Sequence, residues 1–153
     1  MNPLGEKLFN ESKTKEGNFD SVVDEELIRR GNTDVMLQII AKNLIFEIKE
    51  TNSLTKTQEF FNTIEKIQDP IYKNGVLAEA FESFSKNSES QWISLSIAKK
   101  EGVYKDNYLY QLIESCRKTK NKDIALEAAE EITDPQRKSK YLAQIKHQSN
   151  FFK

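Results

Sequence analysis

Apolar residues recur every three or four positions along most of this chain, which is the spacing of one face of an α-helix. Residues 1–19 are polar and are expected to form a mobile tail. Only five Gly and three Pro occur, which leaves little turn chemistry for a sheet, so the sequence predicts an all-α fold. The predicted helices are a short one over residues 21–30 and seven longer ones over 34–50, 55–67, 70–86, 89–100, 104–118, 122–132 and 135–148.

Two Asp-Pro pairs mark corners between predicted helices. Asp69-Pro70 and Asp134-Pro135 each place an aspartate where its carboxylate can accept backbone N–H groups at the start of a helix. Proline suits the next position, because its missing N–H would lack a partner there in any case. Ser88 and Gln91, three residues apart, have the pattern of a capping box at the start of another helix. These signals indicate successive helices joined by short connections.

An acid, a lysine four residues later and a leucine after four more recur three times, at intervals of 32 and 33 residues. Within each set the acid and the lysine lie about one helical turn apart, so the favoured interpretation is a surface ion pair. The alternative is a ladder of lysines along the edge of a binding groove. The three sets are Asp69, Lys73 and Leu77; Glu101, Lys105 and Leu109; and Asp134, Lys138 and Leu142.

The repeat predicts stacked helical hairpins, because its period is long enough for two helices and their connections. Each hairpin buries its apolar face only against its neighbours, so terminal units must differ from internal ones. The short helix is expected to cover the apolar N-terminal end of the array. A single domain over residues 20–153 is predicted, with the short helix over 21–30, hairpins over 34–67, 70–100 and 104–132, and a final helix over 135–148.

Over residues 33–148 the chain resembles tetratricopeptide-like helical-hairpin repeat proteins. The residues that match the family's pattern are Leu77, Leu109 and Leu142 in the first helices of three units, and Pro70 and Pro135 at the corners between units. Where the family has a glycine beside that leucine, this chain has Ala78, Tyr110 and Ala143. The resemblance implies an all-α, right-handed superhelix of about three antiparallel hairpins plus a C-terminal half-unit helix.

The resemblance also implies a non-catalytic protein-interaction module, an adaptor, scaffold or chaperone-like protein, with a protein or peptide partner. In that family the first helices of the hairpins line the concave face. For Tyr72 and Tyr104 the favoured interpretation is packing against the adjacent hairpin, since aromatic residues at helical spacing usually belong to a core. The residues that correspond to the concave face are Tyr72, Glu79, Ser83, Tyr104, Asn107, Gln111, Ser115, Arg137, Lys140 and Gln144.

The charges of the chain nearly cancel, with 23 Lys and Arg against 24 Asp and Glu. No global field therefore draws the protein toward nucleic acid or anionic membranes. The C-terminal half is nevertheless locally basic, so an RNA-binding helical-repeat protein is one alternative function. The lysines on which this alternative depends are Lys99, Lys100, Lys118, Lys120, Lys122, Lys138, Lys140 and Lys146.

Candidate catalytic and metal-binding residues are few. His147 is the only histidine, and it lies on a polar helix without the partners that a catalytic triad or a histidine metal site needs. Cys116 lies on an apolar helix face and is expected to be a small core residue. We therefore expect no metal and no cofactor. An enzyme with no recognisable motif is the second alternative function.

The start of the chain lacks the basic residues and apolar core of a secretory signal peptide, and no apolar run approaches membrane-spanning length. The single cysteine excludes a disulfide within the chain. These features lead us to expect a soluble, cytoplasmic protein. Phe151 and Phe152 follow the last predicted helix. They are expected either to fold back onto it or to stay exposed as a partner site, and a homodimer through the terminal helix or through Phe151 and Phe152 is one such contact.

Overall fold

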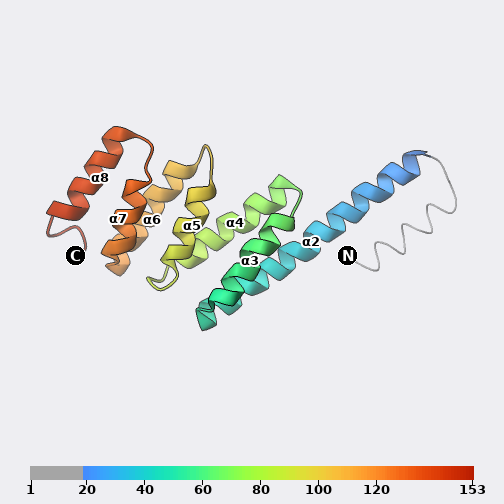
Figure 1. Ribbon diagram of the computed structural model, residues 1–153, viewed down its shortest axis with the longest axis horizontal. Coiled ribbons are helices and arrows are strands. Elements are labelled where there is room, and N and C mark those ends of the chain that lie inside the picture. Colours follow the sequence, from blue (N-terminus) through green and yellow to red (C-terminus); the bar gives the residue numbers. More distant parts are fainter. Residues whose placement is uncertain (1–18) are drawn as a thin grey trace. The chain divides into compact units, whose positions relative to one another are not determined.

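The computed structural model describes residues 19–153, and every regular element in that part of the chain is an α-helix (Figure 1). The all-α prediction is thus confirmed. From α3 onward, each helix begins and ends within two residues of its predicted bounds. The predicted tail lies, apart from Phe19, outside the described residues. The helices are α2 (Phe19–Thr51), α3 (Leu54–Lys66), α4 (Pro70–Ser85), α5 (Gln91–Lys100), α6 (Lys105–Thr119), α7 (Lys122–Glu130) and α8 (Pro135–His147).

The chain divides into two compact units, Met1–Leu77 and Ala78–Lys153. Helices α2 and α3 belong to the first unit and α5 to α8 belong to the second, while the boundary lies within α4. The sequence predicts one domain over residues 20–153 because no linker and no change of composition marks this boundary. A boundary inside a helix leaves no such signal.

Helix α2 is continuous, so the separate short helix predicted over residues 21–30 is wrong. Gly31, which the prediction takes as the end of that helix, lies inside α2. A glycine inside a helix costs only about 1 kcal/mol relative to alanine, and no proline interrupts the backbone hydrogen bonds here. Thr33 is also accommodated within the helix, because its hydroxyl donates to the Arg29 carbonyl at 2.9 Å.

The first unit depends on the contact between α2 and α3. One face of α2 is buried, whereas Val35, Met36, Ile39 and Ile40 remain between 38% and 50% exposed. The predicted cover for this apolar surface does not form from residues 21–30, because those residues extend α2 instead. The buried residues of the two helices and of the turn that follows them are Ala41, Leu44, Ile45, Ile48, Phe60, Ile64 and Ile67.

In the second unit the helices contact one another in two series. Helix α5 packs against α6 and α7, and α7 also packs against α6 and α8. Phe81 of α4 meets Tyr108 of α6 edge to face, with 4.6 Å between the ring centroids. Tyr110 of α6 stacks on Tyr141 of α8, with 5.5 Å between the centroids. Helix α6 therefore has α4 on one side and α8 on the other, while α5 and α7 form the second series.

The corner aspartates cap helices as predicted. Asp69 accepts a hydrogen bond from the Ile71 N–H at 2.9 Å, and Asp134 accepts one from the Gln136 N–H at 3.0 Å. These carboxylates satisfy backbone groups that have no partner within their own helices. The prediction of N-caps at both Asp-Pro corners is confirmed.

A second aspartate at each corner accepts the backbone N–H groups that precede the helix. The Asp34 carboxylate accepts from the two N–H groups of Gln68–Asp69, at 3.0 and 2.9 Å. The Asp106 carboxylate accepts from the two N–H groups of Thr133–Asp134, at 2.9 and 3.2 Å, and from the Thr133 hydroxyl at 2.7 Å. Each corner is thus fastened to the first helix of the preceding hairpin.

The one-turn ion pairs predicted for Lys105 and Lys138 do not form. The Lys105 ammonium lies 3.2 Å from the Glu131 carboxylate, and that of Lys138 lies 3.8 Å from Glu130. Both acids lie at the C-terminal end of α7, where the helix dipole disfavours a carboxylate. The lysines offset that cost, and they connect α6 and α8 to α7. Lys73 of the first set forms no ion pair in the described part of the chain.

Gln91, the first residue of α5, is fully buried and holds three helix ends together. Its amide N–H groups donate to the Ser85 carbonyl and to the Thr119 hydroxyl, both at 2.9 Å. Its carbonyl oxygen accepts from the Asn121 amide at 2.9 Å. The predicted capping box of Ser88 and Gln91 is therefore wrong. The ends of α4 and α6 present polar groups to Gln91, and it satisfies those groups instead of its own helix.

We predict that Asp106→Asn lowers the free energy of unfolding by about 1–2 kcal/mol at neutral pH. Partial burial disfavours the charged carboxylate of Asp106, but hydrogen bonds from Thr133 and Asp134 outweigh it and lower its pKa. A lowered pKa stabilises the fold above the ordinary carboxyl pKa, and this contribution is lost as the pH falls through the folded-state pKa. Urea unfolding at several pH values should therefore show the difference shrinking in acid. Glu127→Gln, an exposed neutralisation on α7, is the control and should change little.

We also predict that Gln91→Leu destabilises the protein by about 2–4 kcal/mol, because the Ser85 carbonyl and the Asn121 amide lose buried partners. Gln111→Leu makes the same chemical change at an exposed position of α6 and should cost less than about 0.5 kcal/mol. Urea unfolding followed by circular dichroism measures both. Equal costs for the two variants would show that Gln91 does not hold the helix ends together.

Candidate functional site

A groove runs between α4 and α6 in the second unit, and we call it the α4/α6 groove. It consists of two hollows of about 500 and 320 Å³ that share Phe81, Glu82 and Gln111. Aromatic and apolar side chains lie at one end, while lysines and hydroxyls lie at the other. The remaining lining residues are Ala78, Tyr104, Asn107 and Tyr108 in the first hollow, and Ser85, Lys86, Ser115, Lys118 and Thr119 in the second.

Uncharged polar side chains follow the α6 side of this groove. Asn107, Gln111 and Ser115 are spaced four residues apart, so they lie one above another on the same helix face. Their side chains have no hydrogen-bond partner in the described part of the chain, whereas Thr119, one turn further, is bonded to Gln91. An amide offers two donors and an acceptor, which suits the N–H and C=O groups of a peptide backbone.

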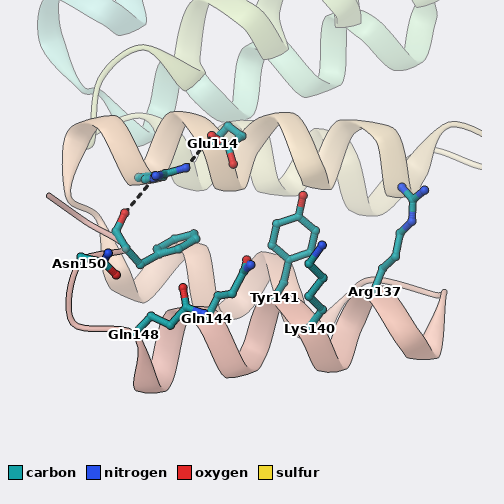
Figure 2. Close-up of a pocket in the computed structure, with 9 residues that line it drawn as sticks. Glu114, Arg137, Lys140, Tyr141, Gln144, Gln148 and Asn150 are labelled. Carbon is teal, nitrogen blue, oxygen red and sulfur yellow. Dashed lines mark hydrogen bonds and ion pairs between the residues drawn. The ribbon is translucent and has the colours of Figure 1, made fainter.

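A third hollow, of about 550 Å³, lies between α6 and α8, and we call it the α6/α8 cleft (Figure 2). Figure 2 shows Tyr141, Lys140 and Gln144 projecting from α8, with Arg137 nearer the start of that helix and Glu114 on α6 opposite. The α8 residues share one side of the helix, because Lys140 and Tyr141 each lie three or four positions from both Arg137 and Gln144. The complete lining is Glu114, Arg117, Arg137, Lys140, Tyr141, Gln144, Gln148, Asn150 and Phe151.

The residues after α8 fold back and close one end of the α6/α8 cleft. Phe151 is only 5% exposed, and its carbonyl accepts a hydrogen bond from the Arg117 Nε at 2.9 Å. The same guanidinium lies 5.3 Å from the centre of the Phe151 ring. Folding back was one of the two expectations for Phe151 and Phe152, and it is the one observed for Phe151. Its ring is consequently not available for a homodimer contact.

Charge is distributed unevenly along the α6/α8 cleft. At the Phe151 end, Arg117 lies 3.7 Å from Glu114, so these two charges offset each other. Toward the start of α8, the Arg137 guanidinium lies 5.2 Å from the centre of the Tyr110 ring. Lys140 forms no ion pair in the described part of the chain. The cleft therefore has a neutral end and a cationic end.

Tyr141 contributes a neutral hydroxyl to the cationic end. Burial raises the pKa of this phenol above its ordinary value, and the neighbouring Glu114 and Tyr110 raise it further, although Arg137 acts in the opposite direction. The hydroxyl is therefore protonated at neutral pH. It can donate a hydrogen bond to an anion lying between Arg137 and Lys140.

Some of the residues predicted for the concave face line the α4/α6 groove, some line the α6/α8 cleft, and others line neither. Tyr104 is 63% exposed, so its predicted packing against the adjacent hairpin is wrong. Tyr72 is half-buried, and it, Glu79 and Ser83 line neither hollow. Tyr104, Asn107, Gln111 and Ser115 line the α4/α6 groove, and Arg137, Lys140 and Gln144 line the α6/α8 cleft.

The side of α6 that faces α8 is not among the predicted binding residues. Tyr110, Glu114 and Arg117 follow one another at intervals of four and three residues, which places them on one face. That spacing could have identified a second polar face on α6. Asn150 left no comparable signal, because its position depends on a tail that folds back onto α6.

Side chains that could bind a metal ion do not gather in the described residues. No group of three or more His, Cys, Asp and Glu side chains comes close enough there to hold a metal ion. Neither Cys116 nor His147 lines the groove or the cleft. No helix in residues 19–153 is long and apolar enough to cross a membrane.

Comparison of the chain with protein-family models, with curated proteins and with solved structures finds no match. The candidate site is therefore interpreted from its own geometry.

We predict that the Cys116 thiol does not react with Ellman's reagent in the folded protein. The thiol is fully buried, and burial raises its pKa to about 12, so almost no thiolate forms near neutral pH. Its Sγ also lies 3.4 Å from the Gln91 carbonyl oxygen, to which the thiol donates. Stoichiometric reaction should appear only after unfolding in urea. Fast labelling of the native protein would show that Cys116 is accessible and would reopen a chemical role for it.

Proposed function

We propose that this chain is a non-catalytic protein-interaction module whose second compact unit binds an extended peptide segment of a partner protein in the α4/α6 groove. The observation that carries the proposal is the row of Asn107, Gln111 and Ser115, whose side chains line the groove without a partner in the described residues. A bound peptide would supply the missing hydrogen-bond partners along its backbone.

The lining of the groove supports a peptide as the occupant. Tyr108 and the exposed Tyr104 offer apolar surface at the same end as Asn107, and the buried Phe81 lines the same hollow. Side chains of a peptide could be buried there, while its backbone is held by the amides. Binding hollows commonly combine apolar walls with a few polar groups that orient the ligand. The mixture of aromatic, amide and hydroxyl groups here has that character.

In this proposal the helices of the second unit form part of a right-handed superhelix, with α4, α6 and α8 as first helices of successive hairpins. The ring contacts of α6 with both α4 and α8 and the separate contact of α5 with α7 are consistent with such stacking. The partner surface would then be the series that contains α6. This assignment explains why the predicted concave-face residues of α6 and α8 line hollows.

RNA binding is a weaker candidate on the same geometry. Lys138 is engaged by Glu130 at 3.8 Å. The lysines of the α6–α7 connection, Lys120 and Lys122, line neither hollow. Binding to single-stranded RNA usually needs aromatic faces on which bases stack, beside a continuous basic groove. The basic residues of the C-terminal half are instead spread over several helices.

We predict that the double variant Asn107→Ala, Gln111→Ala binds peptides about thirtyfold more weakly, since each lost hydrogen bond is worth about 1 kcal/mol. A peptide array of random dodecamers first selects ligands for the unaltered protein, and fluorescence anisotropy then measures their affinity for each variant. The matched control is Gln58→Ala, Asn62→Ala on α3, which removes the same two side chains at the same spacing from an exposed surface.

The peptide array and the affinity measurements can either support or contradict binding in the α4/α6 groove. Selected peptides that bind the α3 control normally and the α6 variant weakly would support the groove as the binding surface. Equal loss in both variants, or no peptide selected at all, would contradict the proposed function. Both variants should retain the helical circular dichroism of the unaltered protein, because all four side chains are exposed.

A further inference from the structure

We propose that the cationic end of the α6/α8 cleft binds the carboxylates of acidic side chains, so that the peptide held by this protein is acidic on the α8 side of α6. This inference rests on the proposed function and adds the chemical class of the ligand. It concerns a different hollow from the α4/α6 groove. It is carried by the geometry and charge of α8.

The side chains on which this inference depends project from one face of α8. Lys140 and Tyr141 each lie three or four residues from both Arg137 and Gln144, which places all four along one side of the helix. All four line the cleft, and Figure 2 shows Lys140 and Tyr141 next to each other. This side of α8 therefore offers two cations, a hydroxyl and an amide to one ligand.

The charges at this end are not offset by the protein itself. Arg117, at the other end, is engaged by Glu114 and by the Phe151 carbonyl. Arg137 has only a long contact of 3.8 Å with Asp134, and both side chains are well exposed, so that pair is weak. Lys140 has no ion-pair partner in the described residues. An anionic ligand would thus meet two cations that the protein leaves available.

The sequence around α8 reinforces this charge balance. No Asp or Glu follows Asp134 in the chain, whereas five basic side chains do: Arg137, Lys138, Lys140, Lys146 and Lys153. Lys138 is drawn toward α7 by Glu130. Of the others, Arg137 and Lys140 are the two that line the cleft. The cationic end therefore contains no acid from within α8, and Asp134 at the start of that helix offsets Arg137 only weakly.

An acidic peptide fits this cleft better than a nucleic acid does. The rings of Tyr110 and Tyr141 are stacked on each other, and Arg137 covers Tyr110. Phe151 is buried against Arg117. These contacts leave little aromatic surface in the cleft for bases to stack on, although such stacking supplies much of the affinity for single strands. Carboxylates need only the cations and donors that this side of α8 provides.

The two hollows can serve one ligand because they flank the same helix. Asn107 and Gln111 lie on the α4 side of α6, while Glu114 and Arg117 lie on its α8 side. A peptide that crosses α6 would place its backbone against the amides and its acidic residues between Arg137 and Lys140. The affinity for acidic peptides should consequently depend on salt, because charged contacts are screened.

The test compares two charge reversals on α8. Lys140→Glu alters the cleft, and Lys146→Glu makes the same change at an exposed position two turns along that does not line it. Both are measured by fluorescence anisotropy against array-selected peptides and against copies of those peptides with Glu and Asp replaced by Gln and Asn. We expect Lys140→Glu to weaken acidic peptides about tenfold, and Lys146→Glu less than about twofold. The neutral copies should bind the unaltered protein more weakly and should not distinguish the two variants.

The following results of these binding experiments would contradict the inference. Array-selected peptides without an excess of Asp and Glu, or equal losses in both α8 variants, would overturn it while leaving peptide binding in the α4/α6 groove intact. No selected peptide at all would overturn both proposals. A phosphoserine peptide that binds in a Lys140-dependent manner while its aspartate counterpart does not would replace carboxylate with phosphate as the ligand group. Lys140-dependent binding of a uridine dodecamer without peptide binding would also contradict the inference.

Discussion

The second unit depends on one buried amide. Gln91 is fully buried, and its four hydrogen-bonding positions are shared among the end of α4, the end of α6 and the connection to α7. An amide buried in this way is costly unless every group finds a partner, and in residues with described side chains no buried side-chain nitrogen or oxygen lacks one. Because these bonds join α4 to α6, they set the spacing of the two helices that form the α4/α6 groove. The stability of the fold and the shape of the proposed binding surface therefore rest on the same side chain.

The Asp-Pro corners satisfy backbone groups at the N-terminal ends of α4 and α8. A short turn before a helix leaves backbone N–H groups without partners, and each Asp-Pro corner uses two aspartates to satisfy them. One aspartate belongs to the corner, while the other comes from the first helix of the preceding hairpin. The second aspartate therefore fixes the corner against the first helix of the hairpin that precedes it in the chain. Lys105 and Lys138 connect α7 to its two neighbours in a similar way.

The faces of helix α6 have different roles: one belongs to the core, and two line the proposed binding surfaces. Leu109, Leu112 and Ile113 are fully buried and form the core, while Asn107 and Gln111 face α4 and Glu114 faces α8. Asn107, Gln111 and Glu114 are exposed and do not take part in the core, so their chemistry is free to serve a ligand. This separation lets the proposed peptide site carry polar groups without cost to the packing.

Features that depend on near neighbours in the chain could be predicted from the amino-acid sequence. Helical spacing gave the bounds of α3 to α8 within two residues, and the Asp-Pro pairs gave two N-caps, because both signals act over only a few residues. Contacts between groups far apart in the chain follow instead from how the helices pack. Asp106 holds a corner 27 residues away, Gln91 bonds Thr119 28 residues away, and Arg117 bonds Phe151 34 residues away. Local patterns do not encode such pairings, since many polar side chains could serve equally until the packing of the helices brings particular ones together.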